Sequence, residues 1–297
     1  MPEKSPNLPD SSDEAHRAAI AGGCAILGAG LVGSYLGAAA GASTVFSRSP
    51  GAAVVRRVAL PNGVRWWRPV ALSDPRVVNG PLLVSCRAHQ TPWDDLPPDV
   101  LVAQNGLGQP RPVIACFFAL DLDADGTVCA IGPAPRIVLA PPGPSWSGVL
   151  ASWREAGITV ELAPDARPAQ WEKAILNATV GPLCLATGLG MAAVWSDAAL
   201  RALVLQATGE GADIAASCAV RIADGLADRA SSFFASVGAH RPSVLRDDGE
   251  LPWIVGHLRR QAQLAGIACP GLDRIDLMVR ERIGSAASPR DSARGRR

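Results

Sequence analysis

Short, mostly apolar runs separated by turn residues make up the first half of the chain. Such runs are typical of strands buried on both faces, and they occur at Cys24–Leu27, Thr44–Phe46, Leu82–Val84, Val100–Val102, Ile137–Leu139 and Ile158–Val160. A helix is predicted over Leu31–Ala42. The runs Val54–Leu60 and Val64–Val70 flank the turn signal Pro61-Asn62-Gly63 and predict a hairpin. Short strands with intervening helices predict an α/β first half.

The pattern changes after Pro164, where strand runs become rare and long helical segments follow from Ala169 to about Arg282. Gly188-Leu189-Gly190 is expected to break one helix, and Pro252 stands where a first helical turn tolerates proline. The predicted organisation is an α/β domain over residues 21–168 and an all-α domain over 169–284. Residues 1–20 and 285–297 are polar and are expected to be flexible tails.

Residues 18–47 carry no charge, which is enough chain to cross a bilayer. Glycines at 33, 37 and 41 even repeat at the spacing of membrane helix pairs. The segment, however, has seven glycines and few large aliphatic residues, and its acidic flank is unlike a secretory signal. We expect a buried strand and a close-packed helix there, with no membrane insertion.

Composition narrows the class of protein. The 28 basic and 27 acidic residues give a net charge of +1. A protein that binds nucleic acid normally has a clear excess of basic residues, so this balance argues against that class. The seven cysteines are widely spaced, which argues against a disulfide framework and indicates a cytoplasmic protein. The histidines at 89, 240 and 257 lack metal-ligand spacing, so no metal is expected. The sequence does not determine the oligomeric state, so both a monomer and a homodimer are considered.

Gly28-Ala29-Gly30-Leu31-Val32-Gly33 is a Gly-x-Gly-x-x-Gly turn between the first strand and the first helix. Its glycines allow a tight turn, close approach of the backbone to a pyrophosphate, and close packing of helix on strand. The alternative is a chance cluster in a segment rich in glycine and alanine. The position after a strand favours a Rossmann-type dinucleotide-binding domain, and the six residues are predicted to bind the cofactor.

The end of the second strand indicates which dinucleotide is bound. An NAD enzyme needs an acidic side chain about 20 residues after the turn, but no Asp or Glu occurs between Glu14 and Asp74. Arg48 stands there instead and suits the 2′-phosphate of NADPH. The alternative is an ordinary surface arginine. The prediction is NADPH.

Lys173 is one of only two lysines in the chain, the other being Lys4. Lys173, Asn177 and Gly181 are four residues apart and share one helix face, a polar stripe that suits a cleft. Arginine would serve a salt bridge equally well, whereas only lysine can lose its proton near neutral pH. Lys173 is therefore the candidate general acid, although a lysine at a domain edge is the alternative.

Together these residues resemble the ketopantoate reductase (2-dehydropantoate 2-reductase) family over about residues 23–283. The resemblance rests on four separated segments: the glycine turn with Arg48, Gln104-Asn105-Gly106, Trp171–Asn177, and Arg241–Asp247 with Gly249-Glu250 and Gly266–Pro270.

The resemblance implies a role for each matching residue. Lys173 corresponds to the catalytic lysine and Glu250 to a catalytic-site glutamate beside it. Asn177 and Ser243 correspond to substrate-binding residues, and Asn105 to an asparagine at the junction of cofactor and substrate. A further cofactor position is Arg87, where the family usually has lysine.

Two positions depart from the family pattern. Gly181 replaces a second asparagine, and Gly249 replaces a threonine. Losing a polar partner weakens discrimination for a hydroxylated substrate. We expect NADPH-dependent reduction of a small 2-oxo acid, first of all ketopantoate to pantoate, with the proton from Lys173. The alternatives are a related oxidoreductase for another 2-oxo acid or an imine, and a non-catalytic NADPH-binding sensor.

Overall fold

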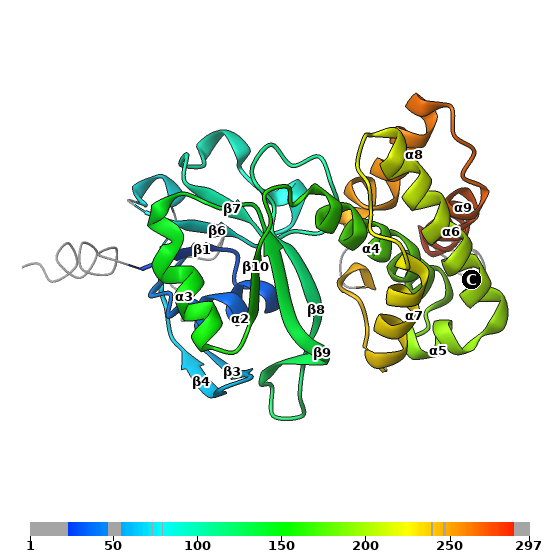
Figure 1. Cartoon of the computed structure of the whole chain (residues 1–297). Coiled ribbons are helices and arrows are strands. Elements are labelled where there is room, and N and C mark those ends of the chain that lie inside the picture. Colours follow the sequence, from blue (N-terminus) through cyan, green and yellow to red (C-terminus); the bar gives the residue numbers. More distant parts are fainter. Residues whose placement is uncertain are drawn as a thin grey trace, which may run out of the picture.

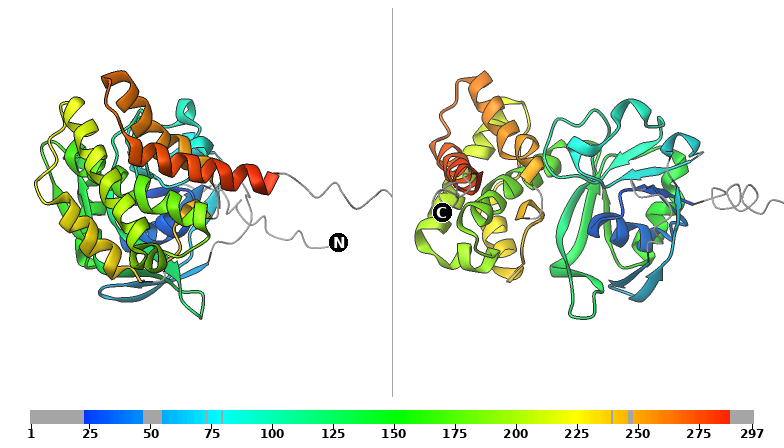
Figure 2. Two further views of the ribbon diagram at one scale, coloured as in Figure 1. Left: turned by 90° about the vertical axis from the view of Figure 1, so that its right-hand side faces the viewer. Right: turned by 180° about the vertical axis from the view of Figure 1, so that it is seen from behind.

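The structure, a computed structural model, describes residues 23–46, 55–72, 74–78, 80–238, 240–245 and 248–287. Figure 1 shows a half built of strands and helices beside a half built only of helices. The two views of Figure 2 show the same two halves from the side and from behind. The predicted fold class, an α/β part followed by an all-helical part, is confirmed. The predicted tail over 1–20 lies outside the described residues.

A five-stranded parallel sheet forms the centre of the α/β half. Its order is β5-β2-β1-β6-β7, with bounds β1 Ala25–Leu27, β2 Thr44–Phe46, β5 Val70–Leu72, β6 Leu82–Val84 and β7 Val100–Val102. Strands β2 and β5 lie on one side of β1, whereas β6 and β7 lie on the other. The chain therefore reverses its direction of winding between β1 and β6, and ligands of open α/β sheets bind at such a point.

A second, mixed sheet packs beside the first. Its order is β10-β9-β3-β4 with β8 paired to β9, and its bounds are β3 Arg56–Leu60, β4 Gly63–Trp67, β8 Ala115–Leu122, β9 Val128–Leu139 and β10 Thr159–Leu162. The predicted hairpin is present as antiparallel β3 and β4. The prediction was wrong at Val70, which begins β5 and pairs with β2 of the parallel sheet. Strand β8 and the first part of β9 were not predicted.

Helix α2 (Leu31–Ala40) lies between the two sheets, and α3 (Ser147–Glu155) packs against it. Tyr35 and Leu36 of α2 share one hydrophobic core with Ile26 of β1. A Cβ atom on Gly37 would lie 2.8 Å from the Trp67 ring, so glycine permits this close packing. The glycine spacing thus serves packing inside the α/β half, and no helix of the described residues is long and apolar enough to span a membrane.

The helical half is built around α4 (Arg167–Thr187), which contacts α5, α6, α8 and α9. The other helices are α5 Met191–Ser196, α6 Ala198–Ser217, α7 Leu226–Ser236, α8 Val255–Ala265 and α9 Pro270–Ala287. Gly188 ends α4 in the left-handed conformation, with φ of 73°, where the break was predicted. Helix α9 continues to Ala287, three residues into the segment predicted as a tail from Ser285, and residues 288–297 lie outside the described residues. Pro252 lies in the short helix η6 (Asp248–Trp253), just before α8.

Candidate active site

The glycine turn connects β1 to the N-terminus of α2 in a backbone conformation that other residues rarely adopt. Gly28 has φ of +110°, and a Cβ atom there would lie 2.5 Å from the backbone nitrogen of Cys86. At Gly33 a Cβ atom would lie 2.0 Å from the carbonyl oxygen of Gly28. These two glycines are therefore required for packing, while Ala29, Gly30, Leu31 and Val32 line a cavity.

Gly30 is the N-cap residue of α2 and offers no side chain to the free N–H groups of the first turn. A Cβ atom at Gly30 would meet no atom within 4 Å, so the helix end faces open space. The first turn also holds no acidic side chain. An uncapped helix N-terminus at the edge of a cavity favours an anion, and this turn fits a dinucleotide pyrophosphate.

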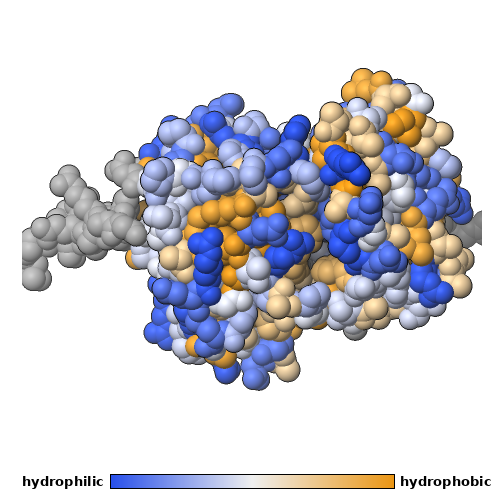
Figure 3. Space-filling view, viewed as in Figure 1, coloured by the Kyte–Doolittle hydropathy of each residue, from blue (hydrophilic) through white to orange (hydrophobic). Residues whose placement is uncertain are grey.

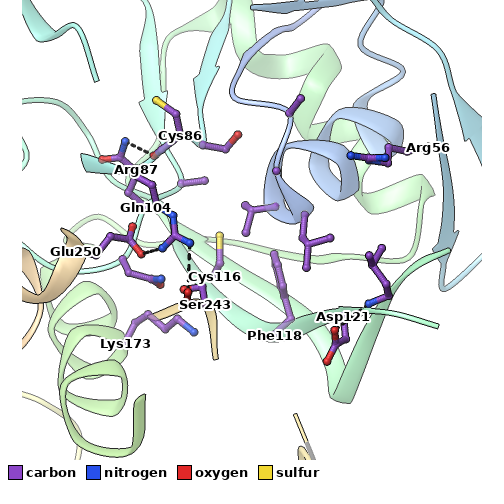
Figure 4. Close-up of a pocket in the computed structure, with 18 of the residues that line it drawn as sticks. Arg56, Cys86, Arg87, Gln104, Cys116, Phe118, Asp121, Lys173, Ser243 and Glu250 are labelled. Carbon is purple, nitrogen blue, oxygen red and sulfur yellow. Dashed lines mark hydrogen bonds and ion pairs between the residues drawn. The ribbon is translucent and has the colours of Figure 1, made fainter. Parts of the chain in front are cut away.

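The cavity has a volume of about 550 Å³ and lies where the two halves of the molecule meet. Figure 3 shows the surface hollowed along this boundary. The residues that line the cavity come from both halves and are Ala29–Val32, Arg56, Ser85–Arg87, Ala103–Asn105, Cys116, Phe118, Asp121, Leu122, Gly126, Lys173, Ser243 and Glu250. Lys173, Arg87 and Glu250 lie at one end, and Arg56 and Asp121 lie at the other (Figure 4).

Lys173 projects from α4 into this cavity and is half-buried. Its Nζ atom lies 5.8 Å from the centre of the Phe233 ring. Loss of hydration lowers the pKa of the Lys173 ammonium, and the nearby Cys116 opposes this shift. Burial also raises the pKa of the Cys116 thiol to about 12, so this neighbour stays neutral. Among the described residues no carboxylate forms an ion pair with Lys173, a setting that suits a proton donor.

Asn105 and Asn177 are brought together from opposite halves. The Asn177 Nδ2 atom donates a hydrogen bond of 2.7 Å to the Asn105 Oδ1 atom. Because Oδ1 accepts this bond, the Nδ2 group of Asn105 is left to donate into the cavity that it lines. Asn177 itself is not part of the cavity wall, so in this structure it orients Asn105.

Arg87, Ser243 and Glu250 also meet across the boundary. The Arg87 Nη1 atom donates to the Glu250 carboxylate in an ion pair, and Nη2 donates to the Ser243 carbonyl oxygen over 3.3 Å. The Glu250 residue is 3% exposed. The Glu250 carboxylate thus pairs with Arg87, and Glu250 and Lys173 lie at the same end of the cavity (Figure 4).

Several residues of the cavity wall were not predicted. Gln104 stands next to Asn105, and its position in the sequence was the available signal. Cys116 and Phe118 lie two residues apart on β8, a spacing that becomes informative only once that strand is known. Arg56, at the start of β3, and Asp121, on β8, gave no signal in the sequence.

Comparison with known proteins gives a family match for the helical half and a relative across most of the chain. Residues 165–282 match the family model described as "Ketopantoate reductase PanE/ApbA C terminal". The resemblance to the ketopantoate reductase family is thereby supported, and the family model covers the helical half of the chain. A 2-dehydropantoate 2-reductase of Mesorhizobium japonicum is 25% identical to it over 232 residues, which are 75% of this chain and 67% of the relative.

Solved structures share the fold of this chain. The 2-dehydropantoate 2-reductase of Geobacter metallireducens GS-15 has a TM-score of 0.72 and 24% identity, with 87% of this chain and 99% of that chain covered. A D-mandelate dehydrogenase solved with NADH and anilino(oxo)acetate has a TM-score of 0.72 and 18% identity, with 89% and 99% covered. Identities this low establish the fold alone.

The two departures from the family pattern have visible consequences for packing. A Cβ atom on Gly181 would lie 3.5 Å from the Val244 side chain and 4.0 Å from the Pro242 side chain, in apolar surroundings. A Cβ atom on Gly249 would lie 2.6 Å from the His89 ring, which fills the space of the missing side chain. Arg48, the predicted contact to the 2′-phosphate, lies outside the described residues.

Proposed function

We propose that this protein is an NADPH-dependent reductase of a small 2-oxo acid, with ketopantoate as the first candidate substrate and pantoate as the product. One observation carries the proposal. The ammonium group of Lys173, whose pKa burial lowers, lines the same cavity as the uncapped N-terminus of α2. A proton donor and a dinucleotide-binding turn thus share one cleft between two domains, as in a dehydrogenase.

The dinucleotide is held by the backbone N–H groups of Gly30, Leu31 and Val32 at the positive end of α2. Arg48 provides a positive charge for the 2′-phosphate, and Arg56 lines the cavity at the end distant from Lys173. A positive charge close to the 2′-phosphate favours NADPH over NADH. When bound, the reduced nicotinamide supplies a hydride to the carbonyl carbon of the substrate.

Lys173 acts on the carbonyl oxygen of the substrate, where negative charge grows during reduction. Its ammonium group stabilises this charge and then donates a proton from Nζ, which leaves the alcohol product and a neutral lysine. A lowered lysine pKa makes this transfer easier than from a fully hydrated lysine. Positioned acid catalysis of this kind contributes about 10² to 10⁴ in rate.

Asn105 and Ser243 orient the substrate. The Nδ2 group of Asn105 donates to a substrate oxygen, while Asn177 keeps its amide in that direction. Ser243 lines the same end of the cavity and offers a hydroxyl group to the substrate. Two fixed polar groups beside one acid limit the poses of a small 2-oxo acid to those that present the carbonyl oxygen to Lys173.

A second candidate substrate is a 2-oxo acid with an apolar or aromatic side chain. The observation that favours it is the apolar environment of Gly181, next to Val244 and Pro242. Gly181, Val244 and Pro242 are not among the residues that line the cavity, whereas Phe118 and Cys116 line it and contribute apolar atoms. Such a pocket offers less hydrogen bonding to the hydroxyl group of ketopantoate than a pocket with asparagine at this position.

The protein is proposed to work in the cytoplasm as a monomer or homodimer, on a small molecule. Cys24, Cys116, Cys129, Cys184, Cys218 and Cys269 belong to the described part of the chain and are free thiols, as expected in a reducing compartment.

Oxidation of NADPH by the purified protein, followed by absorbance with a panel of 2-oxo acids and imines, tests the function. We expect turnover with at least one 2-oxo acid, and faster turnover with NADPH than with NADH. Tight NADPH binding without turnover of any compound would contradict the enzyme and favour a sensor. Turnover of imines alone would indicate a related oxidoreductase.

A further inference from the structure

We propose that Arg87 is a positioning residue, which holds the Ser243 and Glu250 segment of the helical half against the parallel sheet, rather than a ligand of the cofactor. Thr91 and Gln104 in turn fix the direction of Arg87. The inference rests on the proposed function where it concerns the substrate, and on the contacts of the free protein where it concerns the link between the halves.

The guanidinium group of Arg87 reaches two acceptors on the opposite half. Nη1 donates to the Glu250 carboxylate, and Nη2 donates to the Ser243 carbonyl oxygen over 3.3 Å. The side chains are shielded from water, with 22% of Arg87 and 4% of Glu250 exposed. A planar fork with separate donors can bind both acceptors at once, whereas a lysine ammonium is a single compact charge. The arginine is therefore suited to a link between the two halves.

The backbone that carries Arg87 is itself fixed by side-chain hydrogen bonds. The Thr91 Oγ1 atom donates to the Arg87 carbonyl oxygen over 3.0 Å. The Gln104 Nε2 group donates to the Cys86 carbonyl oxygen over 2.6 Å and to the Thr91 Oγ1 atom over 2.7 Å. Gln104 immediately precedes Asn105, so the chain after β7 positions Arg87 and Asn105 together.

The two halves are also in direct backbone contact beside this pair. Gly106 has φ of +89°, and a Cβ atom there would lie 2.1 Å from the Trp253 carbonyl oxygen. The backbone N–H of Leu107 donates to the same carbonyl oxygen over 3.2 Å. A Cβ atom on Gly249 would lie 2.6 Å from the ring of His89. The Arg87 link is thus part of a closely packed interface.

This geometry separates the effects of Arg87 on substrate and cofactor. Ser243, whose carbonyl oxygen Arg87 binds, is the residue proposed to bind the 2-oxo acid. The dinucleotide turn at Gly30–Val32 belongs wholly to the α/β half, whereas Glu250 and Ser243, which accept from the Arg87 guanidinium, belong to the helical half. Weakening the link therefore displaces the substrate site and leaves the cofactor turn in place.

The first test compares Arg87→Lys with the parent in steady-state kinetics and in NADPH binding by fluorescence. We expect the KM for the 2-oxo acid to rise about tenfold or more, with the NADPH dissociation constant within about threefold of the parent value. Thr91→Val should shift KM in the same direction by less. Arg76→Lys, at an exposed arginine paired with Asp74, is the matched control and should change neither quantity. A tenfold loss of NADPH affinity with unchanged KM would overturn the proposal.

The second test is a double-mutant cycle of Arg87→Met, Glu250→Gln and the double variant, measured by urea unfolding of the free protein. A real link predicts that the double variant is no less stable than the less stable single variant. If the losses of unfolding free energy in the two single variants simply add in the double variant, the proposal is overturned. This measurement needs no substrate, so it separates failure of the link from failure of the proposed reductase activity, which the panel of 2-oxo acids detects.

Discussion

Replacement of Gly181 by asparagine tests how the helical half sets substrate preference. Gly181 is buried in α4, and a Cβ atom there would be in ordinary contact with Val244 at 3.5 Å and Pro242 at 4.0 Å. The site therefore accepts a β-carbon without displacing its neighbours. A larger amide would extend toward the stripe of Lys173 and Asn177 on the same helix face.

The magnitude follows from three contributions. Replacing a helical glycine by alanine gains about 0.5–1 kcal/mol, and the following Pro182 offsets part of it because a β-carbon before proline disfavours helical backbone. Burying an amide without a hydrogen-bond partner costs about 1–3 kcal/mol. The free energy of unfolding of Gly181→Ala should therefore be close to that of the parent. The free energy of unfolding of Gly181→Asn should be about 1–3 kcal/mol lower than that of the alanine variant.

Kinetics then determine whether the amide reaches the substrate. A hydrogen bond to the hydroxyl group of ketopantoate is worth about 0.5–1.5 kcal/mol, which corresponds to about a two- to tenfold gain in kcat/KM. The assay compares ketopantoate with its analogue that lacks the hydroxyl group. Gly181→Asn should raise the ratio of the two kcat/KM values relative to Gly181→Ala. An equal ratio in both variants would refute the assignment of Gly181 to the substrate pocket.

Three further outcomes are expected. Arg56→Ala should weaken NADPH binding about tenfold or more and NADH binding much less, while Arg57→Ala, next to it on β3 and absent from the cavity wall, changes neither dissociation constant. The kcat/KM for reduction should fall as the pH rises through the lowered pKa of Lys173, because the protonated form is the donor. Gly106 and Gly266 both have positive φ, but an added Cβ atom would clash with the backbone only at Gly106 and would meet open space at Gly266. Gly106→Ala should therefore lower the free energy of unfolding by more than Gly266→Ala does.

The features that the sequence predicted are those set by local physics. A tight turn between strand and helix needs glycine at Gly28, where φ is +110°. The break of α4 at Gly188 follows from the same freedom of glycine to adopt positive φ. Short apolar runs predicted the parallel strands because both faces of such strands are buried.

The features that it did not predict depend on contacts between distant segments. Strand β9 contains Gly132, Pro133 and Pro135, which normally interrupt a strand. They fall where the pairing with β8 shifts register, between Ile131 and Arg136, so the strand continues through an irregularity. The partner of Glu250 is Arg87, 163 residues earlier in the chain. No local pattern indicates a contact between residues so far apart in the chain, so this ion pair could not be predicted from the sequence.

The central claim is that Lys173 donates the proton, and the kcat of Lys173→Arg tests it most directly. Arginine keeps the charge and nearly the length of lysine, but guanidinium is too weak an acid to release its proton. We predict an NADPH dissociation constant and Tm close to the parent values, with kcat lower by about 10² or more. Lys173→Met, which also removes the charge, should be slower still. A Lys173→Arg enzyme with a kcat near that of the parent would contradict the account, since the proton would then come from another donor.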